Sequence, residues 1–412
     1  MDFGSHHHYR LGFFCVLTRY LILGQACCHL GLMEDAMVLL QTGRRIATAA
    51  FRRESTSRSD DSFTFSNTFQ PNPPSSNPQS PPFPPPTESE SVSNLLSHIK
   101  LLLRRRTAAL AALDAGLPAE SVRHFSKILD GRRGNPHAFA AVCLVGRSAA
   151  YKAAGRITES IADCNRALAL DPTSIPALRA RADLMELVRA LPECLRDLDH
   201  LKLLYDSILR DRKLPGPAWK PHYDVRYRDI PSSLRALTAR IQELRRRVAS
   251  GEGCNVDYYA LIGVRRGCTR SELERAHLLL SLKHKPEKAA GFVDRLEFAD
   301  DHRDLDAVRD QARMSALILY RMLQKGYSSI ASAVMDEEAA ERQRVKAVAA
   351  AAAASAALQA VSAVVSMPEK ATSPVAPVYQ GVFCRDLAVV GSLLSQAGFN
   401  RPIPMKYEAL SC

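Results

Sequence analysis

The 412-residue chain is poor in aromatic side chains, which make up 7% of it and include one tryptophan, so clusters for base stacking are missing. The phosphate-binding motif G-x-x-x-x-G-K-[ST], the nucleophile motif G-x-S-x-G and the zinc motif H-E-x-x-H are all absent. The ten cysteines form no C-x-x-C pair and no zinc-ligand spacing. We therefore expect a protein that is not an enzyme, has no cofactor and no metal, and does not bind nucleic acid.

Long apolar runs are also missing. The run 11–24 is interrupted by Arg19 and is too short to cross a bilayer, and it has no small-residue cleavage site. Cys143, Cys164 and Cys194 fall in expected helices, where free thiols pack as small apolar groups. Unpaired thiols are typical of a reducing compartment. We therefore expect a cytoplasmic or nuclear protein without a membrane partner.

Acidic residues are outnumbered by basic ones: 43 Asp and Glu against 55 Lys and Arg give a net charge of +12. The basic runs 104–106 and 245–247 are compatible with contact to nucleic acid or to acidic proteins. The interpretation that we favour places them on solvated helix faces. A basic, RNA-associated scaffold therefore remains only as a second alternative function.

What the chain does contain is a repeat. Residues 141–172 read AVCLVGRSAAYKAAGRITESIADCNRALALDP. Gly155 permits a turn between two helices, Ala167 is small where neighbouring helices cross, and Pro172 closes the second helix. With Tyr151 also on a consensus position, the segment resembles a tetratricopeptide repeat, a helix–turn–helix unit of about 34 residues.

Further copies surround this one. The next copy starts at Ile175 and the preceding copy near Leu102, followed by a longer loop at 131–137. About three units are needed for a stable stack, so this central set can stand alone. Another copy lies near 17–50 and is expected to dock on the set or to mark the end of a longer array. Because the chain begins inside that copy, we expect an N-terminally shortened product.

The resemblance implies peptide binding in a concave groove. One subclass of these repeats grips the acidic tails of cytosolic chaperones with a clamp of Lys and Asn side chains. Arg106 stands at the first lysine position of that clamp. The other clamp positions hold Leu110, Gly146, Pro176 and Ala180. Clamp binding is therefore not expected, while Arg179 and Arg181 offer a different basic groove.

Another segment, DYYALIGVRRGCTRSELERAHLLLSLKHKPEK, predicts a short helix followed by a longer one. Asp257 caps the short helix and Gly263 ends it. Thr269 or Ser271 starts the longer helix. Pro286 ends it, because proline lacks an N–H and disfavours helix at the residue before it.

A second amphipathic helix over 304–323 completes a predicted antiparallel hairpin with a charged corner. This layout resembles a J domain, which DnaJ-type cochaperones use on the seventy-kilodalton heat-shock chaperone. In the register of that family, Lys285, Pro286 and Glu287 stand where the family has His-Pro-Asp. The resemblance implies that this tripeptide forms an electrostatic latch against the ATPase domain of the chaperone.

The helix face beside the tripeptide departs from the family as well. Leu278 and Leu279 stand where the family usually shows Arg and Lys, and they share this face with Arg275 and Lys283. Exposed positive charge steers association, so two parts of the docking surface are altered together. We expect that this degenerate J-like domain does not stimulate chaperone ATPase. The main alternative is a working cochaperone that tolerates the substituted tripeptide.

The sequence thus predicts an all-α protein, a solenoid of tetratricopeptide repeats followed by a J-like hairpin, with disordered linkers. The expected parts are a detached helix pair (1–54), a disordered Ser/Pro-rich linker (55–95), three repeats (96–213), a connector and helix (214–252), the J-like domain (253–335), an Ala-rich helix (336–367) and a tail (368–412). The arrangement resembles plant DnaJ-type heat-shock proteins with tetratricopeptide repeats. The expected function is a non-catalytic adaptor or scaffold that binds a protein partner, with heat-shock chaperones among the candidates.

Overall fold

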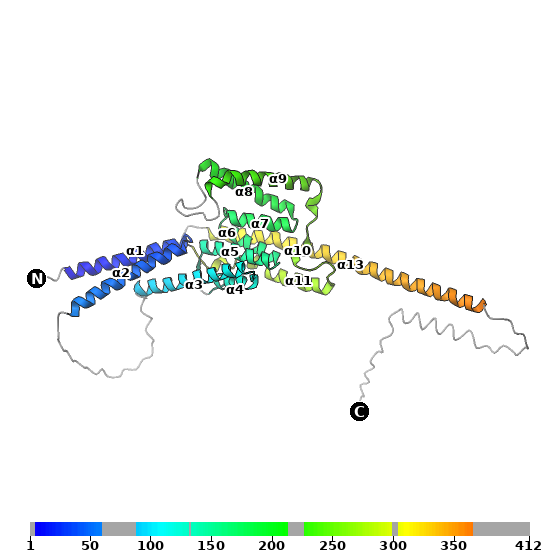
Figure 1. Ribbon diagram of the computed structural model, residues 1–412, viewed down its shortest axis with the longest axis horizontal. Helices are drawn as coiled ribbons and strands as arrows, with labels where there is room; N and C mark the ends of the chain where they lie inside the picture. Colours follow the sequence, from blue (N-terminus) through cyan, green and yellow to red (C-terminus); the bar gives the residue numbers. More distant parts are fainter. Residues whose placement is uncertain (1–4, 60–87, 132, 213–225, 299–303, 366–412) are drawn as a thin grey trace, which may run out of the picture. The chain divides into compact units, whose positions relative to one another are not determined.

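The computed structural model describes residues 5–59, 88–131, 133–212, 226–298 and 304–365 (Figure 1). The protein is all-α as predicted, since the described residues are almost entirely helical. The exceptions are two-residue strands, β1 (Asn135–Pro136) and β2 (Leu296–Glu297). By its contacts the chain divides into a unit Met1–Ala340 and a unit Glu341–Cys412. None of the described helices combines the length and the apolar character needed to cross a bilayer.

The described part of the first unit contains four consecutive helical hairpins. They are α1 (Ser5–His29) with α2 (Met33–Ser59), α3 (Glu88–Asp114) with α4 (Pro118–Leu129), α5 (His137–Ala153) with α6 (Ile157–Leu170), and α7 (Ile175–Leu187) with α8 (Leu191–Asp211). Each hairpin turns at a residue with a left-handed backbone, with φ of 76° at Gly31, 71° at Gly116, 72° at Gly155 and 59° at Arg189. The chain therefore repeats one unit of structure four times.

The hydrogen bonds of the four turns are also the same. In each turn, the residue after the left-handed one donates its N–H to the carbonyl five residues earlier. The pairs are Leu32 with Cys27, Leu117 with Ala112, Arg156 with Tyr151, and Ala190 with Met185. This is the Schellman arrangement that ends a helix at a glycine. Gly155 has the predicted turn role, whereas Arg189 adopts a conformation that costs a residue with a Cβ about 1–2 kcal/mol.

An ion pair between arginine and aspartate recurs in the last two hairpins; it is buried in the first of them and partly buried in the second. Arg147 donates to Asp163 through Nε at 2.6 Å and Nη2 at 2.9 Å. Arg181 donates to Asp197 through Nε at 2.8 Å and Nη2 at 2.6 Å. The two arginines are 34 residues apart in the sequence, and so are the two aspartates. Each bidentate pair joins the first helix of a hairpin to the second.

The N-terminal hairpin docks on the central set, which is one of the two outcomes left open by the sequence. Leu40 of α2 shares an apolar cluster with Leu96 and Ile99 of α3. Helix α2 continues to Ser59 and α3 already starts at Glu88, so the predicted linker 55–95 is too long at both ends. Residues 60–87, like the predicted tail 368–412, lie outside the described residues.

Two elements follow the last hairpin. A 3₁₀ turn, η1 (Tyr227–Asp229), leads into α9 (Ile230–Ala249), the helix predicted from about 232. Helix α9 packs on α8, where Ile241 and Leu244 join Leu198 in one apolar cluster. The 3₁₀ turn η2 (Glu252–Cys254) then starts the J-like region.

The helix caps predicted for the J-like region are confirmed, whereas the role predicted for Pro286 is not. Asp257 caps α10 (Tyr258–Ile262), and Gly263 ends it with φ of 79°. Thr269 caps α11 (Arg270–Lys283) and forms a reciprocal capping box with Glu272. Pro286 does not follow α11 directly, because His284 and Lys285 leave the helix first. Pro286 is instead the first residue of α12 (Pro286–Ala289), where its missing N–H has no cost.

Helix α13 (Leu305–Val365) is longer than predicted. The helix over 304–323 and the Ala-rich helix over 336–367 are one continuous helix. No proline interrupts the sequence from 305 to 365, and alanine has the highest helix propensity. The division between the two units nevertheless falls after Ala340, close to the predicted boundary after residue 335.

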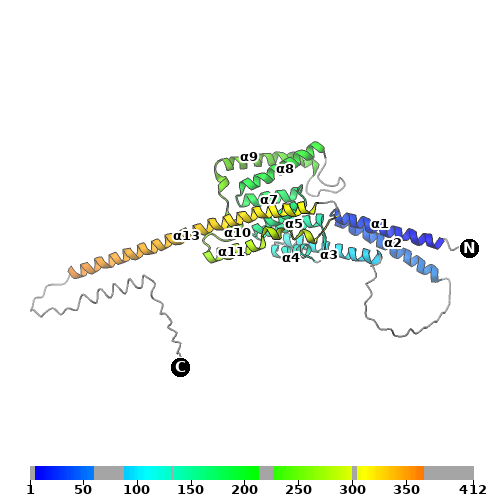
Figure 2. The same ribbon diagram turned by 180° about the vertical axis from the view of Figure 1, so that it is seen from behind.

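Helices α11 and α13 run antiparallel, because the His277 ring stacks on Tyr327 while His284 lies beside Leu319. Gly326 brings α13 close to α10, since a Cβ at that position would lie 2.9 Å from the Tyr258 ring. Both views show α10, α11 and the adjoining part of α13 against the repeat helices (Figures 1 and 2). The J-like region and the repeats therefore share one core.

The longer loop after α4, residues 131–137, contributes to the packing of the J-like region on the repeats. Its strand β1 pairs in parallel with β2, which precedes α13. The rings of His137 and Phe298 stack at 5.1 Å, and Arg295 bonds Asp130 at 3.1 Å. The 3₁₀ turn η3 (Val293–Arg295) adds Val293 to the core formed by α5, α6 and α7. The loop insertion thus fastens the J-like region to the repeats.

Candidate protein-interaction surfaces

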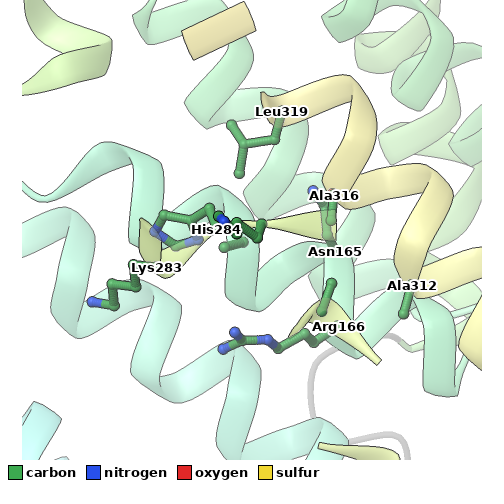
Figure 3. Close-up of a pocket in the computed structure, with 10 residues that line it drawn as sticks. Asn165, Arg166, Lys283, His284, Ala312, Ala316 and Leu319 are labelled. Atoms are coloured by element: carbon green, nitrogen blue, oxygen red, sulfur yellow. The ribbon is translucent and has the colours of Figure 1, made fainter. Parts of the chain in front are cut away.

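The J-like corner packs against α6 of the repeats. Lys283, the last residue of α11, places its Nζ 3.2 Å from Oε1 of Glu159 and 5.7 Å from the centre of the Tyr151 ring. Glu159 also accepts from Arg156, and these cations hold the pKa of the Glu159 carboxyl below its usual value against the effect of burial. Figure 3 shows Lys283 extending away from the side chains that surround His284.

His284 is the buried residue of the corner, with 6% of its surface exposed. Its Nε2 has no hydrogen-bond partner, and burial lowers the pKa of its imidazole from 6.5 to about 4. The ring lies at a cavity of about 20 Å³ that Asn165 and Leu319 also line (Figure 3). A cavity needs about 10–15 Å³ to hold a water molecule, so this one has room for a single water and not for a ligand.

Three further hydrogen bonds hold the J-like region on the repeats. The Thr158 hydroxyl donates to the Leu261 carbonyl, and the Asn165 amide donates to the Ser315 carbonyl at 3.3 Å. The Asp257 N–H donates to the Val188 carbonyl at 2.8 Å. Every residue of α6 except Arg166 is buried as a result of the packing on both sides. The hairpin is therefore a fixed part of the first unit.

The tripeptide itself is only partly open to solvent. Lys285 and Pro286 are half-buried, and Glu287 is exposed. Lys285 lines the same small cavity as His284. The sequence correctly placed these residues at a corner after α11, but gave no indication that the corner faces a repeat helix.

The predicted face of α11 is exposed and apolar. Leu278 and Leu279 are 58% and 61% exposed, and Leu282, which the sequence analysis did not single out, is 47% exposed. Arg275 is exposed on the same helix, whereas the charge of Lys283 is engaged by Glu159. The face thus presents leucines where a J domain presents cations.

The three predicted groove arginines are not brought together. Arg106 bonds Glu34 of α2 at 3.1 Å, and Arg179 donates to the Tyr205 hydroxyl at 2.6 Å. Arg181 is taken up by Asp197 and by Oδ1 of Asn165 at 2.8 Å. Each of the three guanidinium groups therefore binds another side chain of the same molecule. The three arginines do not form a shared basic groove.

Apolar groups are instead exposed on the first helices of the hairpins. Leu101 and Leu110 of α3 and Val142 of α5 are all exposed. A comparison at a fixed period of 34 residues would not have found them, because the equivalent turns at Gly116 and Gly155 are 39 residues apart. The exposed part of the stack thus offers apolar contacts to a partner.

Most arginines of the basic runs 104–106 and 245–247 form hydrogen bonds or ion pairs with neighbouring residues. Arg105 donates to the Lys127 carbonyl, and Arg245 bonds Asp199 at 2.9 Å. Arg246 pairs with Glu243 and Arg247 with Glu252. These contacts favour the interpretation of solvated helix faces over a surface for RNA.

No protein-family model, curated protein or solved structure matches this chain. Within the described ranges, no group of His, Cys, Asp and Glu side chains is arranged to hold a metal ion. The relation to tetratricopeptide repeats and to J domains is therefore a resemblance of sequence pattern and remains a prediction.

Proposed function

We propose that the protein is a non-catalytic adaptor that binds another polypeptide through its repeat hairpins. In this proposal the J-like hairpin is a packed part of the scaffold and does not stimulate the ATPase of the seventy-kilodalton chaperone. The observation that carries the proposal is the packing of residues 283–285 against α6, with Lys283 on Glu159 and His284 buried.

The physical reason lies in access and charge. A corner that acts on a partner has to reach it, and here the side chain of His284 is enclosed and that of Lys283 is neutralised. The adjoining face lacks the cations that steer encounter, because Leu278 and Leu279 occupy their positions. Exposed Leu110 and Val142 instead support apolar contact with a partner through the first helices of the repeats.

A single-turnover ATPase assay with the full chain tests the J-like part of the proposal. We expect the chaperone to hydrolyse ATP at its basal rate, within experimental error, when the full chain is added. Neither the corner at 285–287 nor the leucine face of α11 is expected to dock on its ATPase domain. The double variant Lys285→His, Glu287→Asp is expected to remain at the basal rate, since the corner still packs on α6. Several-fold stimulation by the unaltered chain would support the alternative of a working cochaperone.

The adaptor function is tested by capture of partners with the immobilised full chain. Val142→Arg is expected to abolish capture, because it adds a charge to the apolar outer face of α5. Val345→Arg is a matched control, since Val345 is an exposed valine in the second unit. If both variants capture the same proteins as the unaltered chain, the repeat face is not the binding surface.

A further inference from the structure

A cleft of about 330 Å³ lies where the last repeat hairpin meets the start of the J-like region. It is lined by Arg189 and Leu191 at the α7–α8 turn, Arg247 of α9, Glu252 of η2, and Asn255. The cleft is large enough for a side chain of a partner, in contrast to the single-water cavity beside His284. Its lining combines one buried apolar wall, Leu191, with several polar groups.

Arg189 is in an unfavourable backbone conformation at this cleft. The three equivalent turns have Gly31, Gly116 and Gly155, which adopt positive φ without strain. At Arg189 the same turn has φ of 59°, an uncommon conformation for a residue with a side chain. Glycine at position 189 would therefore form the same turn without backbone strain. Backbone strain of this kind clusters at functional sites, but Arg212 at the end of α8 also has a positive φ, so the strain supports a function of Arg189 only together with the cleft.

Two exposed side chains at the cleft, Arg189 and Asn255, are free to bind a partner. In the part of the chain that the structure describes, the Arg189 guanidinium and the Asn255 side-chain amide have no hydrogen-bond or ion-pair partner. A guanidinium offers five donors in a planar fork that matches a carboxylate. The neighbouring Arg247 already shows this chemistry, since its Nε donates to Glu252 at 2.9 Å.

We propose that this cleft binds a carboxylate side chain of an acidic partner polypeptide, with Arg189 and Asn255 as the principal donors. The inference rests on the proposed adaptor function and names the chemical class of its partner. Glu252 and Glu186 lie close to Arg247, so a singly charged carboxylate is better accommodated than a doubly charged phosphate. The net charge of +12 favours the approach of an acidic chain.

The test uses the full chain and a fluorescent hexaglutamate peptide, followed by anisotropy. We expect saturable binding that weakens with salt and is reduced at least tenfold by Arg189→Gly. The same substitution removes the backbone strain and is expected to raise the Tm by about 2 °C. A loss of binding together with a gain in Tm is a result that a merely structural arginine would not give.

Control variants separate the cleft from general charge effects. Arg196→Gln removes an exposed arginine from α8, and Arg106→Gln removes the predicted groove cation of α3; both are expected to bind hexaglutamate within twofold of the unaltered chain. Hexaglutamine should not bind, and inorganic phosphate should not compete at millimolar concentration.

Three outcomes would overturn the assignment: undiminished binding by Arg189→Gly, an equal loss in Arg196→Gln, or displacement by phosphate at millimolar concentration. These outcomes are distinguishable from a failure of the adaptor proposal. If capture of partners still depends on Val142 while hexaglutamate does not bind, the adaptor proposal stands and the cleft proposal falls.

Discussion

Replacing Asp163 by alanine is expected to lower the free energy of unfolding by about 3–5 kcal/mol. Its carboxylate is 1% exposed and accepts two hydrogen bonds from Arg147, whose side chain is 7% exposed. Without it, Arg147 keeps the Ser126 hydroxyl at 3.2 Å, Asp130 at 3.7 Å and the Tyr151 ring, whose centre is 5.8 Å away. A buried guanidinium would be left largely unpaired, which is the main cost. Chemical denaturation followed by circular dichroism measures the change.

Two controls isolate this contribution. Asp199→Ala removes the partner of Arg245 in an exposed pair at 2.9 Å and is expected to cost at most about 1 kcal/mol. The double variant Arg147→Met, Asp163→Leu replaces both charges by apolar groups and is expected to regain most of the lost stability. Equal effects of Asp163→Ala and Asp199→Ala would show that the buried pair does not hold the hairpin together.

Acid is expected to destabilise the first unit through His284. Burial lowers the pKa of the folded imidazole from 6.5 to about 4, whereas the imidazole of the unfolded chain keeps its ordinary value. The folded state therefore favours the neutral ring. The stabilising contribution of the neutral His284 ring to the free energy of unfolding is complete above pH 6.5. It is lost as the pH falls toward 4. Between pH 7 and pH 4.5 the loss amounts to about 2–3 kcal/mol.

The charges that face His284 come from two elements. Glu159, Asp163 and Arg166 belong to α6, and Lys283 precedes His284 at the end of α11. Carboxylates titrate in the same pH range, so the measurement compares the unaltered chain with His284→Leu by urea unfolding from pH 7 to pH 4.5. We expect the stability difference between the two proteins to shift by about 2–3 kcal/mol in favour of the variant. If the free energies of unfolding of the two proteins fall in parallel as the pH is lowered, His284 does not cause the loss of stability in acid.

The elements that the sequence predicted correctly depend on local interactions. Asp257, Gly263 and Thr269 act on backbone groups within a few residues, so their cap roles follow from residue type and spacing. The same holds for Gly155, whose turn conformation is a property of that residue and its neighbours. Local preference does not state where an element ends when no breaker follows, which is why α13 continues past the predicted boundary at residue 335.

The functional surfaces were predicted less well, because their character depends on partners distant in the sequence. Lys283 and Glu159 are 124 positions apart, and no pattern within either segment indicates that they meet. Arg181 has the appearance of a groove cation in the sequence, yet it is bound by Asp197 from the second helix of its own hairpin. The cleft at Arg189 also escaped notice, because a single arginine in place of glycine is informative only beside the three equivalent turns.

The sequence alone determined that this protein is helical, that Gly155 turns one of its helical hairpins, and that Lys285, Pro286 and Glu287 follow the helix capped by Thr269. These properties follow from periodicity and from the backbone preferences of single residues. The tertiary structure decided that His284 beside the corner is enclosed, that Arg147 and Arg181 are paired with aspartates, and that Arg189 borders a cleft. Burial and pairing depend on which elements meet in space, and that is set by the shared core of the repeats and the J-like region.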